Sequence, residues 1–225
     1  MATLEFFYDV GSPWTYLAFH RIGEVAAEGG AALVWKPILV GGVFNAVNPG
    51  VYAARANPTK PRSDYMAKDL ADWARLYGLR IVWPPSVFPV NSVAAMRGVL
   101  AAFDAGRGVE FSRAAFEVYW GEDRDLSRED VLADVALRAG LDPRELLARI
   151  ATPELKQRLR ANTDELVARG GFGSPTIFVD GDDLYFGNDR LCLVREALAR
   201  LHGSRCEASD PESDEESRWT ASSRS

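Results

Sequence analysis

The sequence predicts an α/β fold: a small sheet, built from both ends of the chain, is interrupted by a large all-helical insertion. Strand-like runs lie at residues 3–8 and 32–39, and again within residues 177–186. Between about residues 63 and 168 the pattern is almost wholly helical. With 225 residues and 47% hydrophobic content, the chain can bury a substantial core, as one domain or as one domain with an insertion.

The N-terminal elements follow from a strand, a tight turn and a helix start. After the run at residues 3–8 the chain reads Gly11-Ser12-Pro13. Ser12 is a residue type favoured at an N-cap, and Pro13 falls at the first helical position, where its missing N–H costs nothing. We expect a helix over 13–28, and with the strand at 32–39 a right-handed βαβ unit.

The middle of the chain carries the periodicity of helices. Apolar residues recur at helical spacing at Leu70, Trp73, Ala74 and Tyr77, and at Val93, Met96, Val99 and Leu100. Further helix starts are predicted at Ser127, with Asp130 as a capping-box acid, at Asp142-Pro143 and at Thr152-Pro153. The Pro-rich segment 57–62 is predicted to be a loop.

The C-terminal part predicts a hairpin and a final helix. Ile177–Val179 and Leu184–Phe186 would pair around the turn Asp180-Gly181-Asp182. A helix from Asp189 to about Leu201 then closes the domain. Residues 204–225 are polar, Ser-rich and acidic at their centre. Such a composition cannot bury enough apolar surface, so we expect a disordered tail.

Composition excludes several function classes. A net charge of -6 and a pI near 5.1 argue against a nucleic-acid binder. Cys192 and Cys206 show no metal-type spacing, so neither a disulfide framework nor a metal site is expected. A cytoplasmic location fits best, because no secretory signal or membrane-length apolar run is seen. The expected partner is a small molecule.

Ser12 is the first candidate for chemistry. If it caps the helix, the partially positive helix end points at its hydroxyl, which suits an anion such as a thiolate. The alternative is that Ser12 only caps, as most serines at such positions do. His20 lies eight residues further on, about two helical turns, too far to act as a direct base for Ser12.

Four motifs together resemble a known family. They are Phe7-Tyr8-Asp9-x-x-Ser12-Pro13-x-x-Tyr16-Leu17-Ala18, Asp69-Leu70-x-x-Trp73-Ala74-x-x-Tyr77-Gly78, Gly173-x-Pro175-Thr176 and Gly187-Asn188-Asp189-Arg190-Leu191. In this order they resemble kappa-class glutathione transferases and bacterial 2-hydroxychromene-2-carboxylate isomerases over roughly residues 3–202. The resemblance implies a DsbA-like thioredoxin fold. Its thioredoxin-like domain would comprise residues 1–50 and 169–203, and its helical insertion residues 51–168.

The resemblance also implies a glutathione site. Ser12 and Thr15 stand where thioredoxin-like oxidoreductases carry their two cysteines, so dithiol exchange is excluded. Ser12 would instead donate a hydrogen bond to the glutathione sulfur and favour the thiolate. Pro175 would be cis, and the main chain of Ser174, which replaces a more usual apolar residue, would pair with the cysteinyl part. The remaining candidates for binding glutathione are Gly187, Asn188 and Asp189 at the last helix, and Asn57 and Lys60 in the insertion.

Three functions are weighed. The favoured one is a glutathione-dependent isomerase of 2-hydroxychromene-2-carboxylate or a related aromatic-degradation intermediate, in which the thiolate adds reversibly and frees a double bond to rotate. The first alternative is a kappa-type transferase or peroxidase acting on small electrophiles. The second is a non-catalytic thioredoxin-fold binding protein, in which Ser12 merely caps. The resemblance further implies a homodimer. Candidates for the walls of an aromatic-substrate pocket are Trp14, Phe44, Trp83 and Phe88.

Overall fold

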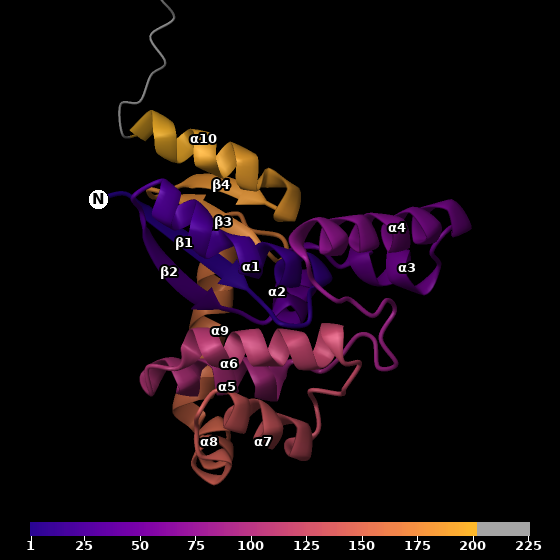
Figure 1. Cartoon of the computed structure of the whole chain (residues 1–225), viewed down its shortest axis with the longest axis vertical. Helices are drawn as coiled ribbons and strands as arrows, with labels where there is room; N and C mark the ends of the chain where they lie inside the picture. The colour runs from indigo at the N-terminus through magenta and orange to yellow at the C-terminus, as the bar shows by residue number, and fades with distance from the viewer. Residues whose placement is uncertain (202–225) are drawn as a thin grey trace, which may run out of the picture.

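A computed structural model of the chain describes residues 1–201 and shows one four-stranded sheet. The strands are β1 (Thr3–Tyr8), β2 (Ala32–Pro37), β3 (Thr176–Val179) and β4 (Asp183–Phe186). Their order is β2-β1-β3-β4, with β1 parallel to β2 and antiparallel to β3, and β3 antiparallel to β4. The two ends of the chain therefore build one sheet, as the sequence predicts (Figure 1).

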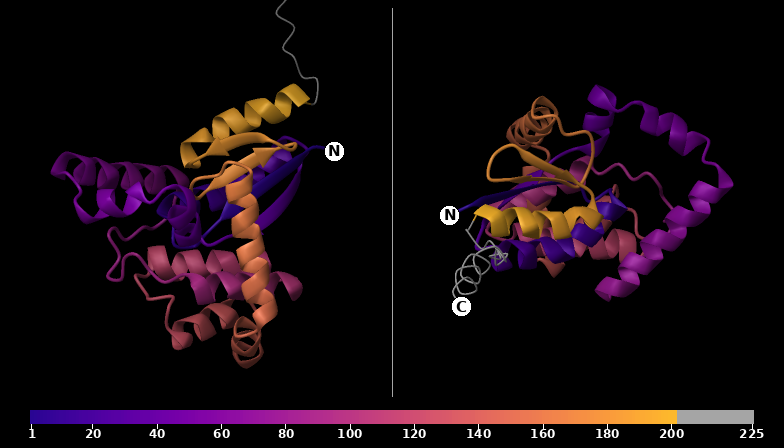
Figure 2. Two further views of the ribbon diagram at one scale, coloured as in Figure 1. Left: turned by 180° about the vertical axis from the view of Figure 1, so that it is seen from behind. Right: turned by 90° about the horizontal axis from the view of Figure 1, so that it is seen from above.

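Alternation along β1 divides the core between the two faces of the sheet. Leu4, Phe6 and Tyr8 belong to the larger apolar cluster, whereas Phe7 belongs to a separate cluster with Phe178. This is the period of two that a strand buried on both faces imposes. Helices α1 (Pro13–Glu28) and α10 (Leu191–Leu201) cover the first face, and α9 (Pro153–Ala168) covers the other (Figures 1 and 2).

The middle of the chain is helical. Its helices are α2 (Val40–Val47), α3 (Gly50–Ala56), α4 (Lys60–Tyr77), α5 (Val93–Asp104), α6 (Gly108–Phe116), a π-helix (Glu117–Gly121), α7 (Glu129–Arg138) and α8 (Pro143–Ile150). Helices α3 and α4 project to one side, whereas α5 to α8 form a separate group below the sheet (Figure 1). The buried Leu70 and Ala74 pack α4 onto Leu17 of α1. The thioredoxin-like and insertion boundaries at residues 50, 51, 168 and 169 remain predictions.

Helix formation begins earlier than the sequence pattern predicts. The strand expected over 32–39 ends at Pro37, because Leu39 is already the N-cap of α2. The loop expected over 57–62 is wrong for its second half. Lys60 is the first residue of α4, and Pro61 lies in its first turn. Backbone N–H groups there have no partner within the helix, so the missing N–H of proline costs nothing.

The predicted helix starts have mixed outcomes. Asp142 caps α8 and Thr152 caps α9, as expected. The start predicted at Ser127 is wrong, since α7 begins at Glu129 and the Ser127 hydroxyl donates to Asp125 over 2.7 Å. Asp130 pairs with Arg128 instead of forming a capping box.

At the C-terminal end, the hairpin β3–β4 is confirmed, with Asp180 and Gly181 at positive φ in its turn. The helix expected from Asp189 starts two residues later, after a 3₁₀ turn over Asn188–Arg190. The tail predicted over 204–225, and Cys206 within it, lie outside the described residues. Within residues 1–201, no helix is long and apolar enough to cross a membrane.

Candidate active site

The turn between β1 and α1 places Ser12 at the start of a helix. Ser12 has extended backbone angles, its Oγ accepts the Thr15 N–H over 3.3 Å, and Pro13 follows at the first helical position. The Ser12 hydroxyl in turn donates to the Ser174 carbonyl over 2.9 Å. Only 8% of the Ser12 surface is exposed. The predicted cap is confirmed, and the hydroxyl joins two segments 162 residues apart in sequence.

Ser174 lies opposite Ser12, ahead of a cis peptide bond to Pro175, as the resemblance implies. Its Oγ accepts the backbone N–H of Asp9 over 3.0 Å and shares a hydrogen bond of 2.7 Å with the Thr15 hydroxyl. The Ser174 hydroxyl, which stands where an apolar side chain is more usual, therefore has a hydrogen-bond partner in Thr15, the residue at the second redox-cysteine position. Ser174 is buried, and its polar side chain is satisfied within the fold.

Asp9 stabilises the turn before α1 through hydrogen bonds to its carboxylate. The sequence analysis did not include it among the candidate site residues. Its buried carboxylate accepts hydrogen bonds from the N–H groups of Gly11 and Val40, each over 2.8 Å, and from the Ser92 hydroxyl over 3.0 Å. Burial raises the pKa of Asp9, and the three donors oppose that rise. A carboxylate directly after a buried strand was the available signal, because such a group needs partners.

A cavity of about 600 Å³ opens beside Ser12, and its lining is mainly apolar. All four aromatic candidates, Trp14, Phe44, Trp83 and Phe88, line it. Ser12 and Ser174 are among the few polar residues in its wall. The structure thus brings the predicted aromatic residues and the Ser12 turn to one concave site, the form expected of a small-molecule pocket.

Trp120 packs against Trp83 and Phe88, which form the aromatic wall of the cavity. The sequence analysis did not single out Trp120. Its indole N–H donates to the Val10 carbonyl over 2.8 Å, and its ring stacks on Trp83 at 6.1 Å between centroids. Trp120 lies in the π-helix that follows α6. Such single turns recur at functional sites and re-aim side chains, but no sequence pattern predicts where they occur.

A second cavity, of about 470 Å³, lies against the start of α10 and shares Trp14 and Phe186 with the Ser12 cavity. Gly187, Asn188 and Asp189 line it, and Gly187 has a φ of 104°, which favours glycine. The Asn188 side-chain amide is buried. Neither its oxygen nor its nitrogen has a hydrogen-bond partner among the described residues.

The Asn188 amide is enclosed by the fold at the border of the α10 cavity. The Tyr77 phenol faces this amide from α4 but lies outside hydrogen-bonding geometry. Asp189 is exposed and paired with Arg190. An unpartnered buried amide is costly, and its role in binding glutathione stays a prediction.

Residues 3–199 match the family model described as a DSBA-like thioredoxin domain. The chain belongs to this family. Its fold is the DsbA-like thioredoxin fold with inserted helices, and Ser12 stands at the helix start that faces the cis-proline.

Similar proteins narrow the activity within the DsbA-like family. The chain is 28% identical to the 2-hydroxychromene-2-carboxylate isomerase of Pseudomonas putida, over 88% of this chain and 95% of that one. It is 29% identical to glutathione S-transferase kappa 1 of Homo sapiens, over 90% and 92%. A solved 2-hydroxychromene-2-carboxylate isomerase superposes with a TM-score of 0.75 at 27% identity, covering 89% of this chain and 96% of that one. These relatives are isomerases and glutathione transferases, which supports enzymatic activity.

Two predicted binding residues lie away from both cavities of this DsbA-like fold. Lys60 is exposed, and its amine pairs with Asp64 over 2.6 Å. Asn57 is the exposed C-cap residue of α3. Neither lines the Ser12 cavity or the α10 cavity, although their neighbours Pro58 and Asp64 line the former. Their role in binding glutathione stays a prediction.

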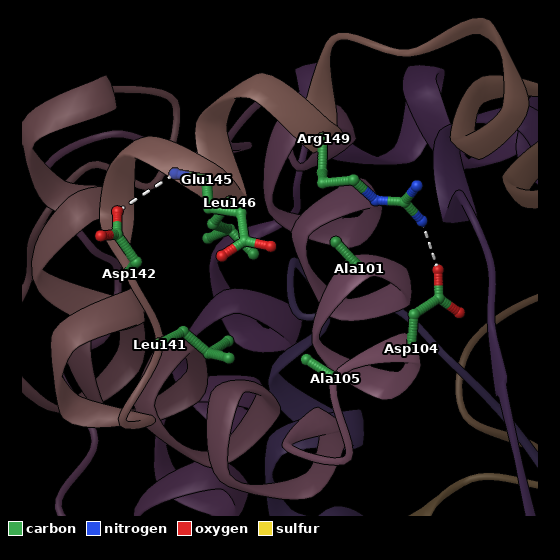
Figure 3. A pocket seen from close by; sticks show the side chains of 8 residues that line it. All are labelled: Ala101, Asp104, Ala105, Leu141, Asp142, Glu145, Leu146 and Arg149. Carbon is green, nitrogen blue, oxygen red and sulfur yellow. Dashed lines mark hydrogen bonds and ion pairs between the residues drawn. The ribbon is translucent and has the colours of Figure 1, made fainter.

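A third cavity, of about 420 Å³, lies between α5 and α8, within the inserted helices (Figure 3). Arg149 crosses it and pairs with Asp104 over 2.6 Å. Asp142 lies at its edge and caps α8. Arg149, Asp104 and Asp142 in its lining already have partners, and the cavity lies apart from the thioredoxin turn.

Proposed function

We propose that this chain is a glutathione-dependent isomerase of 2-hydroxychromene-2-carboxylate or a related aromatic-degradation intermediate. The observation that carries the proposal is the Ser12 hydroxyl at a helix N-terminus, opposite Ser174, in the wall of an aromatic-lined cavity. The isomerases among the relatives support the reaction type, and the kappa-class transferases support glutathione.

The residues present fit glutathione. The Asn188 amide has unused hydrogen-bonding capacity in the α10 cavity. Trp14 and Phe186 connect that cavity with the Ser12 cavity. An extended tripeptide could therefore lie with its glutamyl end at Asn188 and Asp189 and its cysteinyl part at Ser12. When bound, glutathione supplies the sulfur nucleophile that the chain lacks at this turn.

Ser12 would shift the thiol toward its ionised form. A free thiol titrates near pH 8.5, so lowering that pKa by two units needs about 2.7 kcal/mol of differential stabilisation. A hydrogen bond to a charged acceptor and a helix N-terminus are together sufficient for this. Pro13 contributes by having no N–H that needs a partner at the helix start.

The Ser12 hydroxyl has a single hydrogen, which it donates to the Ser174 carbonyl. Donating it to a sulfur releases that carbonyl. The carbonyl can then accept a peptide N–H of the ligand, as at the edge of a sheet. One hydrogen bond is thus exchanged for two new ones, and Thr15 and Asp9 hold the Ser174 side chain in place during the exchange.

The aromatic wall suits a flat substrate. Trp83 and Phe88 contact each other edge to face, with 5.0 Å between ring centroids, and Phe44 also lines the cavity. Aromatic faces bind planar rings with a preference beyond buried area alone. They also exclude water from the Ser12 hydroxyl, which strengthens its interaction with an anion.

The test follows substrate and thiol together. The protein is incubated with glutathione and 2-hydroxychromene-2-carboxylate while substrate absorbance and free thiol are recorded. Isomerisation changes the absorbance and consumes no thiol. Conjugation by a kappa-type transferase consumes thiol in proportion to product, and a binding protein without activity changes neither signal.

Two further expectations are retained as proposals, a homodimer and a cytoplasmic location. For the first, sedimentation at micromolar concentration should show a species twice the chain mass of 24.7 kDa. A monomer alone would contradict it.

A further inference from the structure

Arg55 is a cation in an aromatic environment. It lies in the last turn of α3 and lines the Ser12 cavity. Its guanidinium carbon is 5.1 Å from the centre of the Phe44 ring and 5.6 Å from that of the Phe88 ring. Two of the four aromatic residues predicted to line a substrate pocket thus flank one positive charge, an arrangement that fixes the guanidinium by cation–π contacts.

Arg55 has no anionic partner among residues 1–201. None of the ion pairs or hydrogen bonds in that part of the chain includes it, and the one acid in the cavity wall, Asp64, pairs with Lys60. Many arginines on the fold are paired, such as Arg149 with Asp104 and Arg169 with Glu5.

The charge on Arg55 is nevertheless retained and reachable. Desolvation lowers the pKa of Arg55, but an arginine stays protonated at neutral pH. The residue is exposed at its outer side, so an anion can reach the guanidinium from solvent.

Arg55 also stands at the junction of two cavities. A cavity of about 300 Å³ adjoins the Ser12 cavity and shares Gly11, Val40, Phe44 and Arg55 with it. The α10 cavity with Asn188 shares no lining residue with this smaller cavity. Arg55 therefore lies on the side of Ser12 away from the residues proposed for the glutamyl end of glutathione.

We propose that Arg55 binds the carboxylate of an aromatic substrate and thereby selects carboxylate-bearing substrates over neutral ones. The inference rests on the proposed function for the position of the reacting sulfur. The guanidinium fork can donate two parallel hydrogen bonds to a carboxylate. With the carboxylate at Arg55, the ring would lie against the aromatic wall of the Ser12 cavity, and the conjugated carbons would face Ser12.

The test measures binding without glutathione. The probes are coumarin-3-carboxylate and neutral coumarin, two flat ligands that differ by the carboxylate, titrated by fluorescence. Arg55→Gln should weaken binding of the carboxylate by about 10–100-fold and leave neutral coumarin within about twofold. Arg55→Lys should fall between, because it keeps the charge without the fork.

The matched control is Arg62→Gln, which removes the same charge from an exposed position of α4 that lines neither cavity. It should leave both probes unaffected. Equal weakening of the two probes by Arg55→Gln, or no weakening of either, overturns the inference. So does a loss of glutathione affinity alone, measured by calorimetry, since Arg55 would then hold a glutathione carboxylate.

Turnover separates this inference from the proposed function. If the wild type isomerises 2-hydroxychromene-2-carboxylate and Arg55→Gln leaves its KM unchanged, the inference fails while the function stands. If the carboxylate probe depends on Arg55 but no isomerisation occurs, the function fails while the inference stands.

Discussion

Helices α1 and α8 begin with the same two-residue signal, but their N-terminal ends differ in what they can bind. Each has a capping side chain followed by proline, Ser12-Pro13 in one and Asp142-Pro143 in the other, and each start borders a cavity. At α8 the Asp142 carboxylate accepts the N–H groups of Arg144 and Glu145 over 2.7 and 3.1 Å. At α1 the neutral Ser12 hydroxyl accepts only the Thr15 N–H.

The difference teaches that a helix start becomes an anion site when its cap leaves the positive end uncompensated. Asp142 supplies its own negative charge, so the dipole of α8 is already offset. Ser12 supplies none, and the helix end can stabilise an external anion. The cavity walls follow the same rule. Arg149 of α8 is paired with Asp104, whereas Arg55, in the wall of the cavity beside α1, has no acidic partner within residues 1–201.

Converting the α1 start into an α8 start should have the largest effect. Ser12→Asp keeps a side chain that caps the helix but places a carboxylate where the sulfur anion would lie. Two unit charges about 4 Å apart repel by about 4 kcal/mol in a partly buried site, which corresponds to a turnover loss of about 10³-fold. Stability should fall too, because a buried carboxylate cannot donate to the Ser174 carbonyl, so turnover is expressed per folded molecule. Wild-type turnover in this variant would contradict an anion site at Ser12.

Removing each cap separates the two roles more finely. Ser12→Ala should lower turnover by about 10²–10³-fold, the loss typical of deleting one donor to a developing or bound anion. The pKa of the bound thiol should rise, measured by the ultraviolet absorbance of the thiolate against pH. The matched control, Asp142→Ala, should cost about 0.5–2 kcal/mol of unfolding free energy and leave turnover unchanged. An unaltered thiol pKa in Ser12→Ala would reduce Ser12 to a structural cap.

Much of the fold was predictable because its signals are local. The strand at residues 3–8, the cap at Ser12 and the hairpin near Asp180 all follow from patterns within a few residues. The early helices α2 and α3 were missed because their Gly-rich and short segments carry weak propensity. Their helical state depends on packing, as with Val43 against Leu166 of α9.

Site residues that belong to a sequence motif were predictable, and site residues defined by contacts between distant parts of the chain were not. Ser12 came from the helix-start pattern and Ser174 from the resemblance, and the four aromatic residues were chosen as walls for the aromatic substrate that the resemblance implies. Asp9, Trp120 and Arg55 depend on partners dozens of residues away, such as Ser92 for Asp9 and Val10 for Trp120. Those partnerships exist only once the chain is folded, so single-sequence patterns do not reveal them.

A smaller effect is expected from the support behind the aromatic wall. Trp120→Phe removes the donor to the buried Val10 carbonyl, and leaving that acceptor unpaired costs about 1–3 kcal/mol. Because the wall at Trp83 loosens, KM for an aromatic substrate should rise more than kcat falls. The matched control is Leu146→Val in the cavity between α5 and α8. It should lower the unfolding free energy, measured by denaturant titration, and leave KM unchanged. If KM is unchanged in Trp120→Phe, Trp120 does not support substrate binding.

The smallest effect concerns the middle of α1, where His20 lies about two turns beyond Ser12. Burial and the nearby Arg113 lower the pKa of His20 to about 4, from an ordinary value near 6.5. Between these two pH values the unfolded chain binds a proton that the folded chain does not, so the unfolding free energy should fall as pH drops from 6.5 toward 4. His20→Asn should flatten that part of the profile, measured by denaturant titration at each pH.

The same substitution should leave the pH dependence of kcat unchanged, because His20 contacts the rings of Tyr16 and Phe19 and none of the residues at the Ser12 turn. A kcat profile that loses a titration step in His20→Asn would make His20 a proton acceptor for the site. The N-terminal end of α1 would then no longer act alone, and the contrast with α8 would rest on a base as well as on an uncompensated helix dipole.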